Sequence, residues 1–231
     1  MTRPTRADQL TLLRAAPPAG RRLPGRIRPM ESEPGEGPFD DPGFLFEPWW
    51  PGTRALVFLE SGALRMQAEQ LADPLAALPE LRHLGRQLVE DDTVLDGMLL
   101  VLDRDGRPDP ALLRAHLDGV ARAGGRPAYL AIDLLYRRGR AVTRRPFAER
   151  RALLDDLVRP TDWCGVSRGY RAEGTTVAEA LTALGLAAMS ARRLDAPYHA
   201  GPGGDAWLRI PLAPVTRPAR PTLTVIRSFG L

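Results

Sequence analysis

Residues 43–212 alternate short apolar runs with tight turns and stretches of helical spacing, and this order constrains the fold most strongly. The runs Arg54–Glu60 and Ala63–Met66 are joined by Ser61-Gly62, which predicts a β-hairpin with a two-residue turn. Leucines at helical spacing predict a helix over 74–90. Strands joined by hairpins and interrupted by helices favour an α+β domain over a regular parallel βαβ array.

The same patterns predict the remaining elements. We expect further strands at 44–47, 93–103, 128–136, 186–193 and 206–210, and further helices at 110–123, 147–158 and 177–184. Pro146 stands just before one of these helices, as is common at a helix start. The residues expected to point inward from the helix at 110–123 are Leu112, Leu113, His116, Leu117 and Val120. We expect Gly201–Gly204 to form a flexible loop.

Composition changes at both ends of this domain. Residues 1–42 are rich in Pro, Gly and Arg, which predicts a flexible arm, and residues 213–231 predict a proline-rich tail with a strand-like run at Leu223–Ile226. No apolar run reaches the roughly 20 residues of a membrane span, so no membrane partner is expected. The first residues lack the apolar core of a secretory signal, so we expect a cytoplasmic location.

All 32 basic side chains are arginine, so the chain contains no lysine. Arginine stays protonated and cannot act as an amine nucleophile, which excludes chemistry that begins at a lysine. The net charge of +4 permits nucleic-acid binding without requiring it. The single Cys164 cannot form an internal disulfide or a cysteine-based zinc site alone. The three histidines lack the spacing of metal ligands, so we expect no metal site.

Four segments in order show specific motifs: Glu47–Arg54, Asp96–Leu99, Tyr129–Leu154 and Arg193–Ile210. Together they resemble the adenylation domain of ATP-dependent DNA ligases, especially the bacterial end-joining type. That family shows Glu-x-Lys-x-Asp-Gly-x-Arg, Asp-Gly-Glu-Leu, an aromatic-Asp-Leu-Leu strand before Pro-aromatic-x-Glu-Arg-Arg, and Lys-Arg-Leu-Asp-Ser-Pro-Tyr before Trp-Leu-Lys-x-Lys. The resemblance implies an ATP-grasp-like nucleotidyltransferase fold with antiparallel sheets flanked by helices. The family's second domain, an OB-fold, is not matched, and we expect it to be lacking.

Against the family pattern, the reactive positions differ. Trp49 occupies the position of the lysine nucleophile, and an indole cannot attack phosphorus. Pro51 replaces the aspartate of the same motif, and Met98 and Ala187 replace glutamates that the resemblance implies near the ribose or the metal. Because Mg²⁺ needs hard oxygen ligands, we expect Mg²⁺ and ATP to bind weakly or not at all. Ile132 replaces an aromatic residue that stacks on adenine.

The resemblance also implies a remnant nucleotide pocket, formed by Glu47, Arg54, Asp133, Arg192 and Arg209. Arg192 and Arg209 replace lysines that contact nucleotide phosphates, and arginine can still bind phosphate through two hydrogen bonds. Two interpretations remain for Trp49 and Trp50. They fill the former pocket as apolar side chains, which we favour, or they offer a stacking surface for a base.

The resemblance therefore predicts a DNA ligase-like pseudoenzyme, with ligation and self-adenylation absent. Such a protein would bind nicked or broken duplex DNA, a nucleotide or a DNA-repair protein. One alternative is an active ATP-dependent ligase or nucleotidyltransferase that uses Cys164 or His199 as its nucleophile. The other is a protein-interaction module, which predicts an exposed apolar patch around the former cleft.

Overall fold

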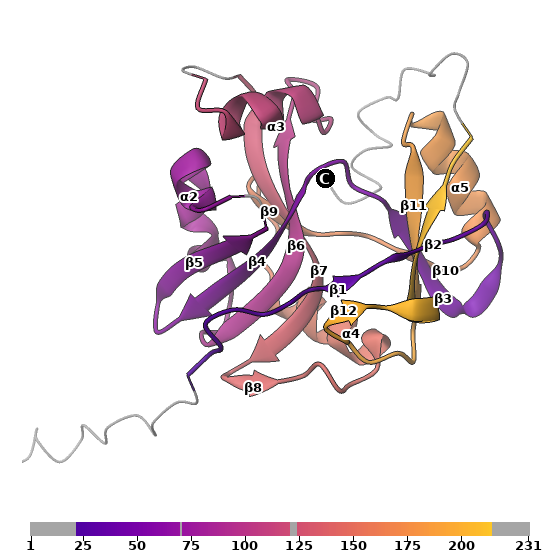
Figure 1. The fold of residues 1–231 in the computed structure, drawn as a ribbon, viewed down its shortest axis with the longest axis horizontal. Coiled ribbons are helices and arrows are strands. Elements are labelled where there is room, and N and C mark those ends of the chain that lie inside the picture. Colours follow the sequence, from indigo (N-terminus) through magenta and orange to yellow (C-terminus); the bar gives the residue numbers. More distant parts are fainter. Residues whose placement is uncertain (1–21, 70, 121–123, 214–231) are drawn as a thin grey trace, which may run out of the picture.

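The structure is a computed structural model that describes residues 22–69, 71–120 and 124–213. Figure 1 shows two sheets side by side, with helices on their outer surfaces. The strands are mostly antiparallel and the helices lie between them in sequence, so the α+β architecture predicted above is confirmed. In the described part of the chain, no helix is long and apolar enough to cross a membrane.

The larger sheet follows the order β5-β4-β6-β7-β8, with β9 pairing in parallel beside β7. Its strands are β4 (Thr53–Glu60), β5 (Ala63–Ala68), β6 (Thr93–Leu102), β7 (Arg126–Arg137), β8 (Arg140–Ala141) and β9 (Cys164–Val166). The predicted hairpin joins β4 and β5, and Ser61 and Gly62 both have positive φ, at 50° and 77°. That backbone geometry matches the twist of the flanking strands.

The second sheet follows the order β10-β3-β11-β13-β2. Its strands are β2 (Glu33–Pro34), β3 (Asp41–Pro48), β10 (Tyr170–Ala172), β11 (Ala188–Arg193) and β13 (Trp207–Pro211). A separate parallel pair joins β1 (Met30–Glu31) to β12 (Gly201–Pro202). Because β3 belongs to this sheet and β4 to the larger one, the four residues Trp49–Gly52 cross from one sheet to the other.

Helices cover the outer faces of both sheets. They are α2 (Pro74–Ala77), the 3₁₀ helix η1 (Pro79–Gln87), α3 (Pro110–Leu117), α4 (Phe147–Leu157) and α5 (Gly174–Ala183). The short 3₁₀ helix η2 (Gly204–Ala206) directly precedes β13. Helix α4 packs against β7, and α5 packs against β3. Asp109 caps α3 by accepting hydrogen bonds from the backbone of Ala111 and Leu112.

Two predicted helices are shorter than expected. The helix predicted over 74–90 is split into α2 and η1, because Pro79 lacks a backbone donor and forces Leu78 out of helical geometry. The helix predicted over 110–123 ends at Leu117, and Gly119 follows with φ of 71°. Val120 is consequently 55% exposed rather than turned inward. Residues 121–123 lie outside the described residues.

The expectation of a flexible arm does not hold for residues 22–42. Leu23 is buried, and its backbone N–H donates to Glu60 Oε1 at 2.9 Å. Met30 is also buried, and its N–H donates to the Tyr198 hydroxyl at 2.9 Å. The expected loop at 201–204 is likewise fixed, because Gly201 and Gly203 donate backbone hydrogen bonds to this same segment. The rest of the predicted arm, 1–21, and the predicted strand Leu223–Ile226 lie outside the described residues.

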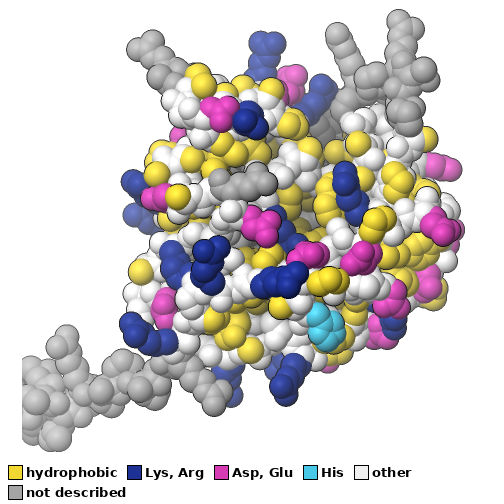
Figure 2. Space-filling model, in the orientation of Figure 1, with side chains coloured by type: hydrophobic (Ala, Val, Ile, Leu, Met, Phe, Trp, Pro, Cys, Tyr) yellow, Lys and Arg dark blue, Asp and Glu magenta, His cyan; other side chains and the backbone are white. Residues whose placement is uncertain are grey.

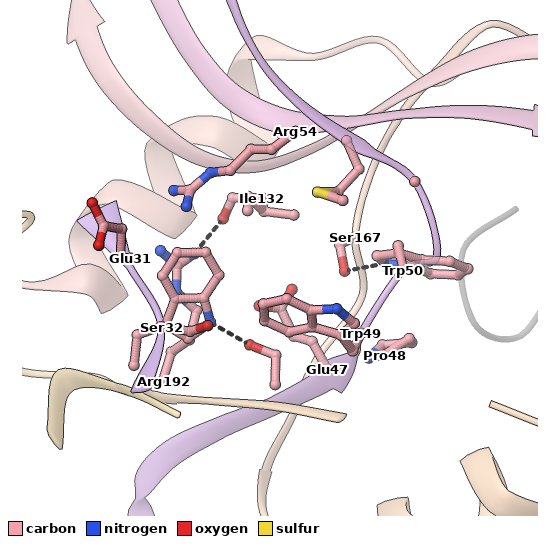
Figure 3. A pocket seen from close by; sticks show the side chains of 14 residues that line it. Glu31, Ser32, Glu47, Pro48, Trp49, Trp50, Arg54, Ile132, Ser167 and Arg192 are labelled. Carbon is pink, nitrogen blue, oxygen red and sulfur yellow. Dashed lines mark hydrogen bonds between the residues drawn. The ribbon is translucent and has the colours of Figure 1, made fainter. Parts of the chain in front are cut away.

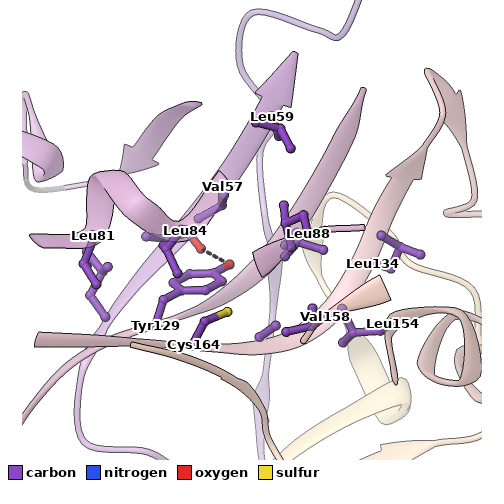
Figure 4. Packing of buried hydrophobic residues seen from close by; sticks show 14 of the residues in the cluster. Val57, Leu59, Leu81, Leu84, Leu88, Tyr129, Leu134, Leu154, Val158 and Cys164 are labelled. Carbon is purple, nitrogen blue, oxygen red and sulfur yellow. Dashed lines mark hydrogen bonds between the residues drawn. The ribbon is translucent and has the colours of Figure 1, made fainter. Parts of the chain in front are cut away.

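The main core lies between the larger sheet and α4, α2 and η1. Leu84, Tyr129, Leu134, Leu154 and Cys164 pack together there (Figure 4). A second cluster fills the space beneath α5. A third lies on the opposite face of the larger sheet and includes the buried residues Phe58, Ile132 and Trp207, with Trp49 packed against the cluster. Ile132 and Trp207 of this cluster line the site described next.

Candidate functional site

A cavity of about 350 Å³ opens beside the crossing from β3 to β4. Figure 3 shows Trp49, Arg54, Ile132 and Arg192 around it, and Glu31 and Ser32 of the N-terminal segment also line it. Its walls therefore combine both sheets with residues that composition alone assigned to an arm.

The two adjacent tryptophans lie in different surroundings. Trp49 is half-buried, and its ring lies 5.8 Å from the Trp207 ring at an interplanar angle of 38°. Trp50 is buried, and its Nε1–H donates to Ser167 Oγ at 3.0 Å (Figure 3). Trp50 packs with a small apolar cluster around Leu100. Trp50 is therefore packed and hydrogen-bonded, whereas Trp49 is only half-buried; both line the cavity, which remains open between the sheets.

Gly52 has a structural role. A Cβ atom at this position would lie 2.3 Å from the Leu99 carbonyl oxygen and 2.5 Å from Leu100 Cδ2. No real Cβ atom approaches a backbone oxygen so closely, so the crossing chain passes β6 here only as glycine. The family motif's glycine is thus explained by packing.

Glu47 lies on β3 at the cavity and is only 2% exposed. Arg151 of α4 donates from Nη1 to Glu47 Oε1 at 2.7 Å. Burial lowers the pKa of Arg151, but the Glu47 carboxylate outweighs burial and leaves that pKa raised. Glu47 therefore serves as the internal counter-ion of a largely buried arginine. The sequence argument missed Arg151, although the consecutive Arg150-Arg151 pair in the family motif was the available signal.

Arg54 on β4 is held by Asp96 of β6, to which its Nε donates at 2.9 Å. The Tyr198 hydroxyl donates to the other oxygen of Asp96 at 2.8 Å. Burial lowers the pKa of Arg54, but Asp96 outweighs it and raises the pKa above its ordinary value. The Arg54 guanidinium also lies 4.5 Å from the centre of the Trp207 ring. Its charge is therefore balanced inside the protein.

Asp133 on β7 is fully buried beneath the cavity. Arg150 donates to both of its oxygens at 2.8 Å, and Arg192 donates to Oδ2 at 2.9 Å. Burial by itself raises the pKa of Asp133, but Arg192 and Arg150 outweigh it and hold the pKa below its usual value. Arg192 also donates to the Ile132 carbonyl oxygen at 2.9 Å. Asp133 thus pairs with two buried arginines and does not line the cavity.

Arg209 on β13 lies outside this cavity. Its guanidinium is 5.2 Å from the centre of the Trp49 ring, and the side chain lines a neighbouring hollow. Of the five residues predicted to form a remnant nucleotide pocket, the structure brings Glu47, Arg54 and Arg192 to one cavity. It places Asp133 beneath that cavity and Arg209 beyond its Trp49 wall.

Magnesium ions have no suitable ligand set among these residues. The buried carboxylates of Glu47, Asp96 and Asp133 are each engaged by an arginine. Within residues 22–69, 71–120 and 124–213, no group of three or more His, Cys, Asp or Glu side chains could hold a metal ion. Met98 lines the cavity with a thioether, and Ala187 lies in the neighbouring hollow. The chemistry of this donor set does not fit Mg²⁺.

The two alternative nucleophiles lie away from the cavity. Cys164 is 3% exposed in the main core, where burial raises the pKa of its thiol to about 12 (Figure 4). His199 is exposed and does not line the cavity. Neither side chain is therefore positioned to attack a nucleotide bound between the sheets.

Comparison with known proteins points to the ligases. No family model matches the chain. The Mycobacterium tuberculosis protein "Multifunctional non-homologous end joining DNA repair protein LigD" is 30% identical over 166 residues, which cover 72% of this chain and 21% of that protein. A "Probable DNA ligase" of Anaeromyxobacter is 31% identical over 202 residues, covering 82% and 38%. This chain thus matches about a fifth of the length of LigD.

Solved structures show the same fold. A mycobacterial DNA ligase D complexed with ATP and MES aligns at a TM-score of 0.70 and 29% identity, covering 80% of this chain and 60% of that one. A Chlorella virus DNA ligase-adenylate aligns at a TM-score of 0.58 and 12% identity, covering 80% and 67%.

Proposed function

Because this chain contains a DNA ligase adenylation domain homologous to the ligase domain of bacterial LigD, we propose that it is a ligase-like protein that lacks ligase activity. In this proposal it binds DNA or a nucleotide in DNA repair. The ATP-grasp-like classification and a cytoplasmic location are parts of the same proposal. The observation that supports it most directly is the Trp49 indole in the cavity wall, at the position of the motif's lysine.

Self-adenylation needs a nucleophile that can form a bond to phosphorus. The indole of Trp49 carries an N–H donor and no basic lone pair, so it cannot replace an amine. The chain has no lysine elsewhere, and Cys164 and His199 lie away from the cavity. Ligation through an enzyme-bound adenylate therefore lacks the nucleophile that would form the adenylate.

Charge balance also opposes phosphoryl chemistry in the cavity. Such chemistry depends on cations that stabilise the transferring phosphate. Here Arg54 and Arg192 point their charges at Asp96 and Asp133. A nucleotide phosphate would have to compete with carboxylates that these arginines already hold.

DNA binding is supported by homology and by the distribution of charge. The LigD relative is named for non-homologous end joining and DNA repair. In Figure 2, acidic side chains gather over the five-stranded sheet, while arginines are more frequent over the larger sheet. Arginines on one side of a domain attract a phosphate backbone with an affinity that falls as salt rises.

The test has a catalytic arm and a binding arm. Intact mass after incubation with ATP and Mg²⁺ is expected to show no adenylate adduct, and nicked duplex is expected to remain unsealed. An active LigD ligase domain is the positive control. An adduct, or sealing above a no-enzyme control, contradicts the loss of activity. Cys164→Ser and His199→Ala would then identify the nucleophile.

The binding arm compares labelled nicked and intact duplex DNA across a range of salt concentrations. We expect tighter binding to the nicked duplex and weaker binding at higher salt. Absence of binding at low salt would contradict the DNA-binding part of the proposal and leave the catalytic part standing.

A further inference from the structure

A second hollow, of about 430 Å³, lies against the Trp49 side chain and extends toward α5. We call it the Trp49 groove. Its apolar lining includes Trp50, Pro51, Pro108, Leu184 and Leu186. A further hollow beside it shares Trp49, Ala188 and Arg209, so the depression continues along β13. The two hollows therefore adjoin at Trp49 and Arg209.

The groove carries positive charge and no negative charge. Neither Asp nor Glu lines it, whereas Arg107 and Arg209 do. Arg209 is exposed, stacks on Trp49, and forms no ion pair with any carboxylate in the described part of the chain. This distinguishes Arg209 from Arg54, Arg151 and Arg192, each of which forms an ion pair with an internal carboxylate.

We propose that the Trp49 groove binds an acidic, apolar peptide segment of a partner protein. Apolar side chains of the peptide would pack on Leu184, Leu186 and Pro51, and a carboxylate would pair with Arg209. Docking of an amphipathic segment into an apolar groove is a common mode of peptide recognition. A guanidinium binds a carboxylate through two parallel hydrogen bonds, which fixes the register of the segment.

Two other occupants fit the groove less well. Single-stranded nucleic acid binds through successive aromatic platforms and repeated cations, whereas prolines and leucines form half of this lining. Residues 214–231 of the chain itself contain three arginines and no acidic residue, so they would bring like charge to Arg209. Charge complementarity therefore favours an acidic partner.

Binding of a short labelled peptide that alternates Asp and Glu with Leu and Phe tests the proposal on the full chain. A matched peptide carries Asn and Gln in place of every acid. We expect the acidic peptide to bind and the amide peptide to bind much more weakly. Arg209→Ala should weaken the acidic peptide about tenfold or more, as expected for the loss of a charge-assisted pair. Arg140→Ala removes an equal charge at an exposed site on β8 and should leave binding unchanged.

Two further variants separate loss of binding from loss of fold. Leu184→Asp places a carboxylate in the groove and should abolish binding of the acidic peptide. Arg209→Glu should reverse the preference, so that a peptide with Lys in place of its acids binds best. Each variant is first checked for an unchanged unfolding temperature.

Three outcomes would overturn the proposal: equal affinity for the acidic and amide peptides, equal effects of Arg209→Ala and Arg140→Ala, or no peptide binding. Binding of labelled oligo-dT in place of the peptide would assign the groove to nucleic acid. These results are independent of the adenylation and nick-binding assays, so either proposal can fail alone.

Discussion

The Arg192 guanidinium donates to Asp133 Oδ2 at 2.9 Å, and both side chains are almost completely buried. Arg150 occupies the same carboxylate from the other side. The three charges form a closed group beneath the cavity, with one anion between two cations. The family motif has a lysine at the position of Arg192, and the resemblance implies that this lysine contacts a nucleotide phosphate. In this chain the Arg192 side chain is part of a buried ion group that contributes to the structure.

Asp133→Asn should therefore destabilise the protein severely. The change keeps the shape of the side chain but leaves two buried guanidinium groups without their counter-ion, which costs on the order of 3–5 kcal/mol. Urea unfolding at neutral pH measures the loss. Asp105→Asn, at an exposed turn, is the matched control and should change stability by less than about 0.5 kcal/mol. Equal losses of unfolding free energy in the two variants would show that the buried ion group does not stabilise the fold.

Glu90 should give the protein a measurable pH dependence. Arg137 and Arg138 each donate to its carboxylate at 2.7 Å, and the hydrogen bond from Arg137 lowers the pKa of Glu90 to about 2. Because the pKa of Glu90 is lower in the folded protein than its ordinary value of 4.5, ionised Glu90 stabilises the fold at pH values above 4.5. This contribution is lost as the pH falls from 4.5 toward 2. The contribution is about 1 kcal/mol or less, because the pair is close to the surface.

Comparison of the wild-type chain with Glu90→Gln isolates this effect. The difference in unfolding free energy should be constant from pH 7 to about 5 and shrink below pH 4.5. A difference that stays constant down to pH 3 would contradict the assignment.

Gly52→Ala should destabilise the crossing between the sheets. Its Cβ atom would meet the Leu99 carbonyl oxygen at 2.3 Å, and backbone cannot move aside as a flexible side chain can. We expect a loss of more than about 2 kcal/mol, at the upper end of overpacking effects. Gly37→Ala is the control, since nothing lies within 4 Å of its added methyl group. Thermal unfolding of both variants measures the difference.

Cys164 should be unreactive in the native protein. Its thiol is buried and its pKa is raised to about 12, so almost no thiolate is present at pH 8. A colorimetric thiol reagent should label it slowly in buffer and rapidly in urea. Rapid labelling of the folded chain would show that the core opens around β9. It would also support the alternative in which Cys164 acts as the nucleophile.

Local sequence signals predicted most of the sheets. The hairpin of β4 and β5 follows from alternation and a two-residue turn. The motif resemblance placed Arg192 near Glu47 and Arg54, although Arg192 is far from both in sequence. The split of the helix after residue 74 was also readable, because Pro79 interrupts the pattern. The regular spacing of the leucines nevertheless favoured a single helix over 74–90.

The partners of the charged residues were not predictable in the same way. Nothing local shows that Arg151 reaches Glu47, or that Asp133 binds two arginines, because these pairs depend on how α4 and β11 pack. Composition also misled at residues 22–42. A segment rich in Pro and Gly can still be held by single contacts, such as that of Leu23 with Glu60.

Trp49 belongs to the walls of both the cavity and the groove. Occupancy of the two spaces becomes thermodynamically linked when a ligand in one of them moves this indole. A ligand in one space that requires the indole to shift changes the affinity of the other space by some factor. The second ligand must then change the affinity of the first by the same factor. The side chain at the position of the motif's lysine is thus also the residue that would couple the two binding events.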